Sequence, residues 1–281
     1  MAVGVLSKPR PRMKLFKQTD LATVSGIALA VIGLFFGLWL EGIHLSEISQ
    51  LTAALIVFCG TAGAVLISMP LEQVRLALKS MPGMLHSPVQ KPGELIEVIL
   101  SFARAARLRG IVSLEQETEL IEDDFLQKAM RLAVDAVGPE MIRTVLDSDI
   151  AGAKARAETV AAVFEAAAGY APTLGMAGAA VGLIQVLKHL DHVDQVGVGV
   201  ASAFVATIYG LLLANLVLLP VATKIRARTE LRAGACDLIR DGVVLIASGV
   251  NPSLIRLNLE ALAQVGQSAR LGPGRKAAIA A

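Results

Sequence analysis

The sequence predicts an all-α integral membrane protein with four transmembrane helices and a helical cytoplasmic domain. Hydrophobic residues make up 54% of the 281 residues and the mean hydropathy is +0.63, which is too apolar for an ordinary soluble domain. Charge is concentrated rather than spread, because residues 71–165 hold 11 Lys/Arg and 15 Asp/Glu, or 26 of the 50 charged residues. Separate portions of the chain should therefore face lipid and water.

Four uncharged stretches are long enough to cross a bilayer, which takes about 20 apolar residues in a helix. They are residues 21–40, 48–71, 166–187 and 195–223. Each should be helical, because an isolated strand or loop would leave backbone amides unpaired in lipid. The first stretch comes after a basic N-terminus but is too long for the apolar part of a signal peptide, so we interpret it as a retained first span.

The placement of Lys and Arg predicts the orientation of these spans. Five basic residues lie in the N-terminal tail and four come after the fourth span, whereas the connections 41–47 and 188–194 contain only Lys188. The positive-inside rule then places both termini in the cytoplasm. The predicted organisation is a cytoplasmic tail (1–20), transmembrane helices 1 and 2 (21–71), a cytoplasmic helical loop (72–165), transmembrane helices 3 and 4 (166–223) and a cytoplasmic C-terminal tail (224–281).

The cytoplasmic loop shows apolar residues at helical spacing. We expect helices at 94–108, 125–137 and 139–146, and the tail should pack against them through Ile239, Val243 and Ile246. The last stretch, 266–281, is rich in Gly, Pro and Ala and is expected to fray.

The third and fourth spans are dominated by small residues, whereas the first carries Phe and Trp. Spacing such as that of Gly178 and Gly182 lets two helix backbones approach closely. The third and fourth spans should therefore face protein, and the first two should face lipid. The glycines expected at the close contacts are Gly175, Gly178, Gly182 and Gly210.

Two prolines, Pro172 and Pro220, interrupt these inner helices. Each removes a backbone hydrogen bond, which makes a static kink and a functional hinge equally consistent with the sequence. No Asp, Glu, Lys, Arg or His lies deep in any span, although an ion carrier normally needs such a group. Either another chain supplies that group or the spans are an anchor.

Several classes of site have little support. The two cysteines, Cys59 and Cys236, lie far apart and should be small buried side chains, which argues against a disulfide framework or a thiolate metal site. The acidic run 115–124 lacks the pattern of a calcium loop and should be a solvated helix face. His189 and His192 flank Asp191, which is thin support for a metal site. We predict no metal, no catalytic residues, no organic cofactor and no nucleic-acid partner.

Six segments of the chain carry motifs that follow one another in order and with compatible spacing. Residues 170–183 read YAPTLGMAGAAVGL, similar to APxxGMIGTxxGL, and residues 203–220 are similar to ALLTTxYGxxLAN…P. Residues 107–115, RLRGIVSLE, resemble RxxGxxxLE, and residues 20–26, 60–64 and 249–252 fit the same pattern. Together these segments resemble the MotA family of flagellar stator subunits. The resemblance covers about residues 20–262.

This resemblance implies an ion-driven motor subunit in the bacterial inner membrane. It implies a homo-oligomer, expected as a pentamer, around a MotB-like single-span protein with a membrane aspartate and a cell-wall-binding domain. That aspartate would be the missing carboxylate. Pro172 and Pro220 match the family's coupling prolines, and Arg107 and Glu115 match the charged pair that binds the flagellar rotor.

The ion pathway departs from the family pattern at two threonines. Ala179 and Ala206 stand where the family has hydroxyls, which leaves Thr207 as the main hydroxyl of the pathway. Sodium needs several oxygens to replace its hydration shell, whereas a proton can travel along water and one carboxylate. The transported ion is therefore expected to be H⁺, with Na⁺ as the alternative. Thr207 could instead bond its own helix backbone.

Three rival functions stay open at this point. An energiser of the ExbB/TolQ type uses the same inner helices, but it usually has three spans and an outside N-terminus. A solute carrier would commonly show duplicated halves and polar midplane residues, which this sequence lacks. An inert membrane scaffold would neither conduct nor move with any partner.

Overall fold

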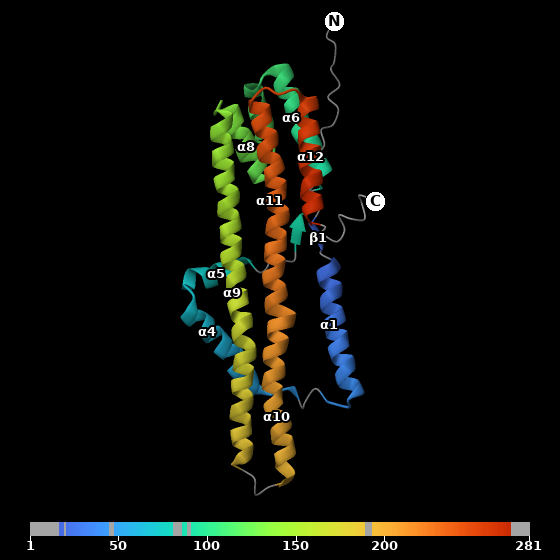
Figure 1. Cartoon of the computed structure of the whole chain (residues 1–281), viewed down its shortest axis with the longest axis vertical. Coiled ribbons are helices and arrows are strands. Elements are labelled where there is room, and N and C mark those ends of the chain that lie inside the picture. The colour runs from blue at the N-terminus through green and yellow to red at the C-terminus, as the bar shows by residue number, and fades with distance from the viewer. Residues whose placement is uncertain are drawn as a thin grey trace. The chain divides into compact units, whose positions relative to one another are not determined.

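The computed structural model describes residues 17–19, 21–44, 48–80, 86–88, 91–188 and 193–270, with side chains from 24 to 265 outside 45–47, 81–90 and 189–195. The chain is almost entirely helical, as predicted (Figure 1). The structure differs from the all-helical prediction in one pair of short hydrogen-bonded strands, β1 (Lys17–Thr19) and β2 (His86–Pro88). No alternation of apolar and polar residues in the sequence predicts them. The basic tail before residue 17, the His189–His192 group and residues 271–281 lie outside the described residues.

The described chain divides into two compact units. The apolar unit holds the described residues of 18–87 and 155–229, and the charged unit holds those of 88–154 and 230–270. Two long helical segments, residues 139–187 and 193–247, contribute to both units. The boundary between the units therefore follows the segregation of charge along the sequence and does not coincide with the ends of helices.

The N-terminal part of the apolar unit contains the first two predicted spans. Helix α1 (Leu21–Leu40) is 20 residues long, and its described side chains are exposed except for Ala30 and Leu38, which are half-buried. The second span consists of α3 (Leu51–Ala54), a π-helical turn η1 (Leu55–Cys59) and α4 (Gly60–Ser68). Helix α5 (Leu71–Ser80) comes next, with an amphipathic pattern.

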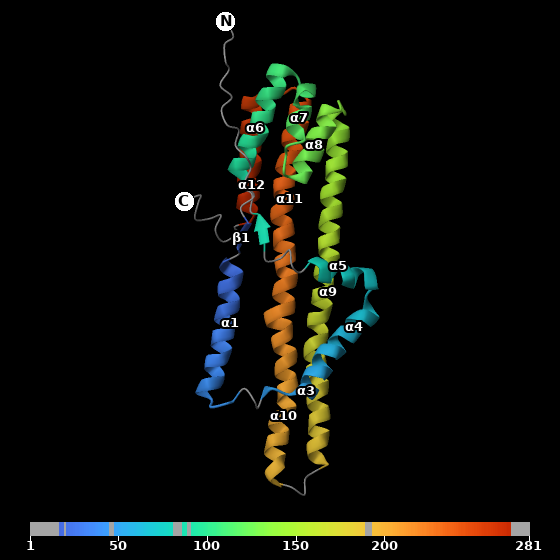
Figure 2. The same ribbon diagram turned by 180° about the vertical axis from the view of Figure 1, so that it is seen from behind.

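The third span is the C-terminal part of a 49-residue helix, α9 (Pro139–Leu187). The prediction of a separate short helix at 139–146, with a break before the span, was therefore wrong. Residues 147–165 are rich in alanine and contain no proline, and their one glycine, Gly152, costs a helix only about 1 kcal/mol, so the helix continues through them. At 1.5 Å per residue α9 is about 74 Å long, and its C-terminal part runs beside α10 (Figures 1 and 2).

The fourth span is also continuous with the helix after it. Helix α10 (Val193–Leu212), the π-helical turn η4 (Leu213–Leu218) and α11 (Leu219–Ala247) succeed one another without a gap. By length and composition, three of the described helices can cross a membrane, those beginning at Leu51, Pro139 and Val196, and residues 24–40 form a shorter apolar helix.

The charged unit is a helical bundle with its own apolar core. Its helices are α6 (Pro92–Arg109), the 3₁₀ turn η3 (Ile111–Leu114), α7 (Glu115–Thr118), α8 (Asp124–Val134), the start of α9, the end of α11 and α12 (Pro252–Arg270). The core confirms the expected packing of the tail, since it contains Ile239, Val243 and Ile246 beside Leu95, Ile99 and Leu126. The predicted fraying of residues 266–281 was wrong for residues 266–270, because α12 continues to Arg270.

A glycine turn joins α11 to α12 and accounts for the GVNP sequence. Gly249 has φ +70°, a conformation that glycine adopts without steric cost, and it lies just past the end of α11. Its amide donates to the Ile246 carbonyl at 3.0 Å, and the Asn251 side chain accepts from the Ser253 amide at 3.1 Å. Pro252 then starts α12 where no intrahelical amide is required.

Candidate ion pathway and rotor-facing surface

Helices α9 and α10 approach each other through glycines. A Cβ added to Gly210 would lie 2.4 Å from the Ala171 carbonyl oxygen, and one added to Gly175 would lie 2.8 Å from the Ala206 carbonyl oxygen. The corresponding contacts at Gly178 and Gly182 are with the Cβ atoms of Ala206 and Ala203, at 2.9 Å and 2.8 Å. Atoms of the facing helix occupy the space that side chains would need, so any larger residue would force these two helices apart.

The three predicted ion-pathway residues occupy two different environments. Ala206 is 2% exposed and faces Gly178 inside the subunit. Thr207 and Ala179, in contrast, are half-buried in the isolated chain. Neighbouring residues on a helix point about 100° apart, so Ala206 and Thr207 cannot both face the same surface. The geometry makes Ala206 a packing position and leaves Thr207 and Ala179 accessible to a neighbouring chain.

The two prolines have different local surroundings. Pro172 lies inside α9, and its Cα would be 3.1 Å from a Cβ on Gly210. Pro220 lies just after the π-helical turn η4, where the ladder of backbone hydrogen bonds is already irregular. The Asn215 side chain donates to the Leu211 carbonyl at 2.9 Å within this region. The LAN…P sequence thus forms a π-helical turn in which Asn215 makes a side-chain hydrogen bond. Pro220, which has no amide hydrogen, follows this turn.

A polar contact ties the start of the second span to α10. The Tyr209 hydroxyl donates to the Ile48 carbonyl at 2.5 Å and accepts from the Gln50 amide at 3.3 Å. The Ser202 hydroxyl donates to Gln50 Oε1 at 2.8 Å. Ser202 and Gln50 also line a cavity of about 540 Å³ between the second, third and fourth spans, and Ala206 and Gly178 line it too. Gln50 is not among the residues predicted to form the pathway.

One buried hydroxyl in the second span has no hydrogen-bond partner within the described chain. Thr61 is 5% exposed, and its Oγ1 is unpaired. It lies two residues after the π-helical turn η1. Nearby Cys59 is exposed, so the expectation that both cysteines are buried was wrong for this one, whereas Cys236 is buried and burial raises the pKa of its thiol to about 11.

An arginine clamp joins α9 to α11 next to the predicted ends of the third and fourth spans. The Arg226 guanidinium donates to both oxygens of Glu158, at 2.8 and 2.5 Å, and to both oxygens of Glu165, one of them at 2.8 Å. These hydrogen bonds lower the pKa of both carboxyls below their usual range. No sequence pattern indicates this pairing, because Arg226 on α11 is 61 residues away from Glu165.

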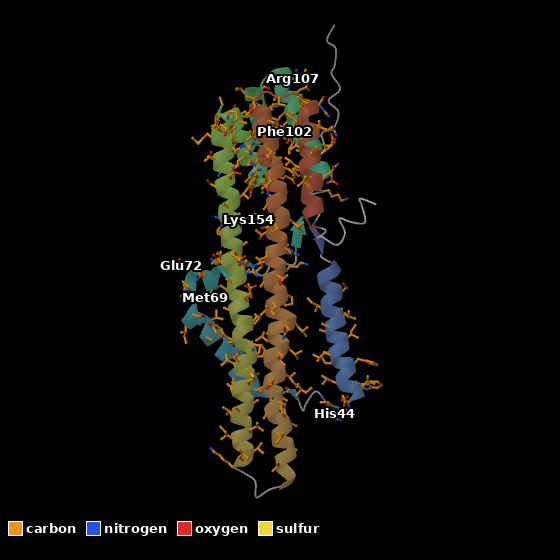
Figure 3. All side chains as sticks on the ribbon, viewed as in Figure 1. His44, Met69, Glu72, Phe102, Arg107 and Lys154 are labelled. Carbon is orange, nitrogen blue, oxygen red and sulfur yellow. The ribbon has the colours of Figure 1, made fainter. Side chains whose placement is uncertain are left out.

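In the charged unit, the RLRGIVSLE sequence forms the corner between α6 and α7. Gly110 has φ +84° and ψ 152°, a region that is essentially restricted to glycine. Leu114 is fully buried in the core. Arg107, labelled in Figure 3, and Glu115 lie on either side of this turn, and both are exposed. The motif therefore combines a turn glycine, a buried anchor and two outward charges.

Neighbouring basic residues at this corner already have partners. Arg109 donates to Glu117 at 2.8 Å, and Arg104 lies 4.0 Å from Glu97. Arg107 and Glu115 form no ion pair with the rest of the described chain. The three arginines near this corner are thus unequal, and within the described residues the predicted pair, Arg107 and Glu115, is the one left free to bind another molecule.

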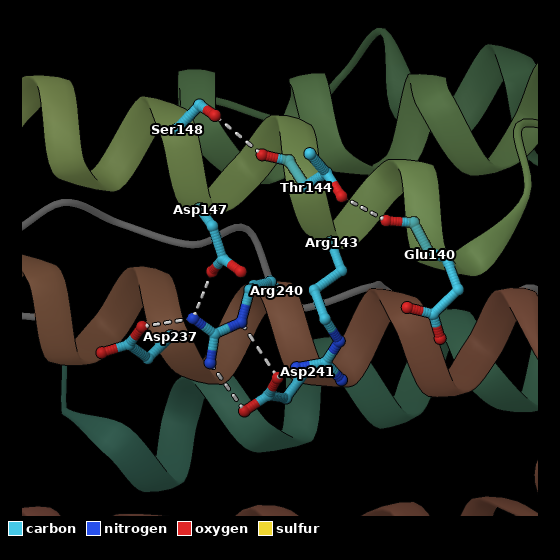
Figure 4. Close-up of polar contacts among 8 residues, drawn as sticks. All are labelled: Glu140, Arg143, Thr144, Asp147, Ser148, Asp237, Arg240 and Asp241. Carbon is cyan, nitrogen blue, oxygen red and sulfur yellow. Dashed lines mark hydrogen bonds and ion pairs between the residues drawn. The ribbon is translucent and has the colours of Figure 1, made fainter.

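Ion pairs also connect α9 to α11 inside the charged unit. Arg240 of α11 donates to Asp147 of α9 at 2.6 Å and to Asp237 at 2.8 Å, and it binds both oxygens of Asp241 at 3.0 Å (Figure 4). Arg143 adds a bond of 3.1 Å to the same Asp241. This network fixes the register of the two long helices where they enter the core.

The prediction that the acidic run 115–124 is a solvated helix face was wrong at Asp123. This residue is 5% exposed, and its carboxylate accepts from the amides of Phe125 and Leu126, which caps α8. Arg232 of α11 binds the same carboxylate at 2.8 Å. Among the described residues, no group of three or more His, Cys, Asp or Glu is placed to hold a metal ion.

Comparison with known proteins places these features in a family. The model of the MotA/TolQ/ExbB proton channel family matches residues 117–236. Motility protein A of Bacillus subtilis is 31% identical over 245 residues, which cover 85% of this chain and 89% of the relative. Chemotaxis protein PomA of Vibrio alginolyticus is 33% identical over 236 residues, covering 84% and 92%.

The chain belongs to the MotA family. Two solved structures resemble the fold of this MotA-family chain. The structure of C. jejuni MotAB superposes with a TM-score of 0.82 at 29% identity, covering 86% of this chain and 95% of that one. The flagellar MotAB stator complex of Bacillus subtilis gives a TM-score of 0.80 at 31% identity, covering 85% and 94%. The resemblance drawn from the motifs is confirmed, and so is the prediction of an all-α membrane protein.

Proposed function

We propose that this chain is the stator subunit of a bacterial flagellar motor and forms an ion channel with a MotB-like partner. The observation that carries the proposal is the close-packed α9–α10 wall, in which Thr207 and Ala179 stay accessible while the spans contain no Asp, Glu, Lys, Arg or His. Such a wall cannot bind an ion by itself and needs a carboxylate from another chain. The similar solved structures are complexes of MotA with a second protein, MotAB.

The partner in this proposal is a single-span protein with a membrane aspartate and a cell-wall-binding domain. Several copies of the chain, five in our proposal, surround it in the bacterial inner membrane with their termini in the cytoplasm. The charged unit then lies in the cytoplasm, where Arg107 and Glu115 bind charged groups of the rotor. Pro172 and Pro220 couple ion passage to movement of the inner helices.

The proposed ion is H⁺, because alanine stands at positions 179 and 206 and Thr207 is the main hydroxyl beside them. Full dehydration of Na⁺ requires several replacement oxygens. This part of the proposal is tested separately from the channel itself, by measuring flux and swimming with a proton gradient alone and with a sodium gradient alone.

The test of the function compares the chain with and without its partner. Proteoliposomes that contain both proteins should conduct ions, and those that contain this chain alone should not. The two genes together should restore swimming to a bacterium that lacks its own stator. Flux through the chain alone would contradict the proposal. Restoration of an outer-membrane process instead of swimming, with a periplasmic N-terminus, would favour an energiser of the ExbB/TolQ type.

A further inference from the structure

Glu165 shares one face of α9 with the coupling proline Pro172 and with Ala179 of the proposed ion pathway. Positions 158, 165, 172 and 179 are seven residues apart on an unbroken α-helix. Seven residues return to the same face with a drift of about 20° per heptad. Glu165 therefore lies in line with Pro172 and Ala179, about 10 Å and 21 Å from them along the axis.

This face of α9 is only partly covered within the subunit, by Arg226 at its two glutamates and by Gly210 beside Pro172. Glu158 is exposed, and Glu165, Pro172 and Ala179 are half-buried. The buried residues of the same helix, such as Val160, Ala161 and Phe164, pack against α4, α5 and α11 in a separate apolar cluster. The stripe that these four residues form is thus partly open, at each position, to water or to a neighbouring chain.

The charged groups that shift the pKa of Glu165 come from two helices. Arg226 of α11 is the first, and Glu158 of α9 is the second. Lys224 and Arg228 lie two residues on either side of Arg226, and both have partners. Helix α5 packs near this region, and its Glu72 and Arg75 are exposed. With two carboxylates against one bound guanidinium, the Arg226 cluster carries an excess of one negative charge.

We propose that Glu165 is the residue that receives the transported ion at the cytoplasmic end of the pathway, with Arg226 and Glu158 holding it in place. This inference rests on the proposed function. Glu165 is the first carboxylate on the stripe beyond Ala179 and Pro172, and it directly precedes the predicted third span. A cation that leaves the pathway on this side meets a net negative cluster rather than an uncompensated arginine.

For a proton, the transfer involves only O–H bonds. The proton released from the partner's aspartate crosses water as hydronium and binds a carboxylate oxygen of Glu165, which becomes neutral. Arg226 then keeps its bonds to Glu158, so no guanidinium is left unpaired. Glu165 next gives the proton to cytoplasmic water and becomes a carboxylate again, and the bonds to Arg226 re-form.

The test uses the full complex of this chain with its partner in proteoliposomes. Proton flux is driven by a potassium diffusion potential and recorded with an entrapped pH dye. E165Q keeps the size of the side chain and removes its charge, so flux should fall by about 100-fold or more, the contribution typical of a single proton-transfer group. E165D keeps the carboxylate and should retain most of the flux.

Glu158 offers a matched control on the same helix. It binds the same arginine with the same kind of bond but lies one heptad farther from the span. E158Q removes one of the two carboxylates that hold Arg226, so flux should fall by only a few-fold, as for the loss of one exposed ion-pair partner, because Glu158 does not receive the proton. Equal losses in E158Q and E165Q would mean that the clamp only holds the helices together, and the inference would be wrong. Unchanged flux in E165Q would overturn it as well.

The pH profile separates ion transfer from a structural role. Arg226 keeps the pKa of Glu165 low, so wild-type flux should persist until the cytoplasmic-side pH falls below the usual carboxyl range. In R226Q the pKa of Glu165 rises, and the loss of flux should move to higher pH at a matched driving force. An unshifted profile in an assembled R226Q complex would contradict the inference. Failure of the proposed function is distinguishable, because then the wild-type complex itself would show no flux.

Discussion

Gly210 lies against Ala171 so closely that a Cβ on the glycine would come within 2.4 Å of the alanine's carbonyl oxygen. This contact joins the two inner helices one residue before Pro172. A carbonyl oxygen belongs to the helix backbone and cannot turn away as the end of a long side chain can. The distance between the helices at this level is therefore set by the absence of a single methyl group.

G210A should separate α9 from α10 and impair the protein. Overpacking of this kind typically costs about 1–3 kcal/mol, and we expect lower thermal stability in detergent together with loss of swimming. Gly197 on the same α10 is the control, because a Cβ there would meet nothing within 4 Å. G197A should be neutral or slightly stabilising, by up to about 1 kcal/mol from helix propensity. Equal effects of the two substitutions would show that the close contact is unimportant.

P172A should abolish swimming while the complex still assembles. The substitution restores a backbone amide in the middle of α9, which can bond to the Ala168 carbonyl and stiffen the helix. Stability should stay the same or rise. P139A on the same helix is the control, since Pro139 is the first residue of α9 and its amide has no intrahelical partner. Normal swimming in the P172A strain would count heavily against a coupling role.

R107A should weaken rotor binding without changing ion flux. An exposed ion pair contributes only about 0.2–1 kcal/mol, so swimming should slow by a few-fold, and the charge reversal R107E should reduce it further. Swimming speed and proteoliposome flux are measured on the same variants. R109A is the control, because Arg109 is bound to Glu117 within the chain. A larger loss of swimming in R109A than in R107A would show that the wrong residue has been assigned.

T61V should leave the isolated subunit as stable as before or stabilise it by up to about 1 kcal/mol. It replaces a hydroxyl that is buried without a partner in the described chain with a methyl group of nearly the same shape. Thr118 is the contrasting case, since its buried hydroxyl donates to the Leu114 carbonyl at 2.9 Å. T118V should therefore destabilise the chain by about 1 kcal/mol. Thermal unfolding in detergent measures both, and a marked loss of stability in T61V would reveal a hydrogen bond formed in the assembled protein.

D123A should destabilise the charged unit by about 2–3 kcal/mol, because it removes a helix cap and leaves Arg232 without this carboxylate. The cost is below that of a fully buried pair, since the Arg232 side chain is 46% exposed. D124A, next to it, changes an exposed carboxylate in the first turn of α8 and should cost less than about 1 kcal/mol. Limited proteolysis of the loop and thermal unfolding both report the difference. A larger effect of D124A would disprove the assignment.

Some of the site could be predicted from sequence pattern alone. The glycine spacing on the third and fourth spans, the turn glycine of the RLRGIVSLE sequence and the helical spacing of the tail all depend on residues that are close together in the chain. Helical periodicity is a local property, so these features were accessible without a structure. The continuity of α9 could have been predicted as well, since the alanine-rich stretch contains no proline.

The sequence by itself determined the apolar spans, the segregation of charge and the lack of an acidic or basic group deep in the membrane portion. Only the tertiary structure decided that Ala206 is buried while Thr207 remains accessible, and that Arg226 holds Glu158 and Glu165. It also decided that Arg109 is paired, whereas Arg107 has no ion-pair partner within the described residues. The physical reason is that hydropathy belongs to each residue and adds along the chain, whereas the choice of a partner depends on which side chains a distant helix brings within hydrogen-bonding distance.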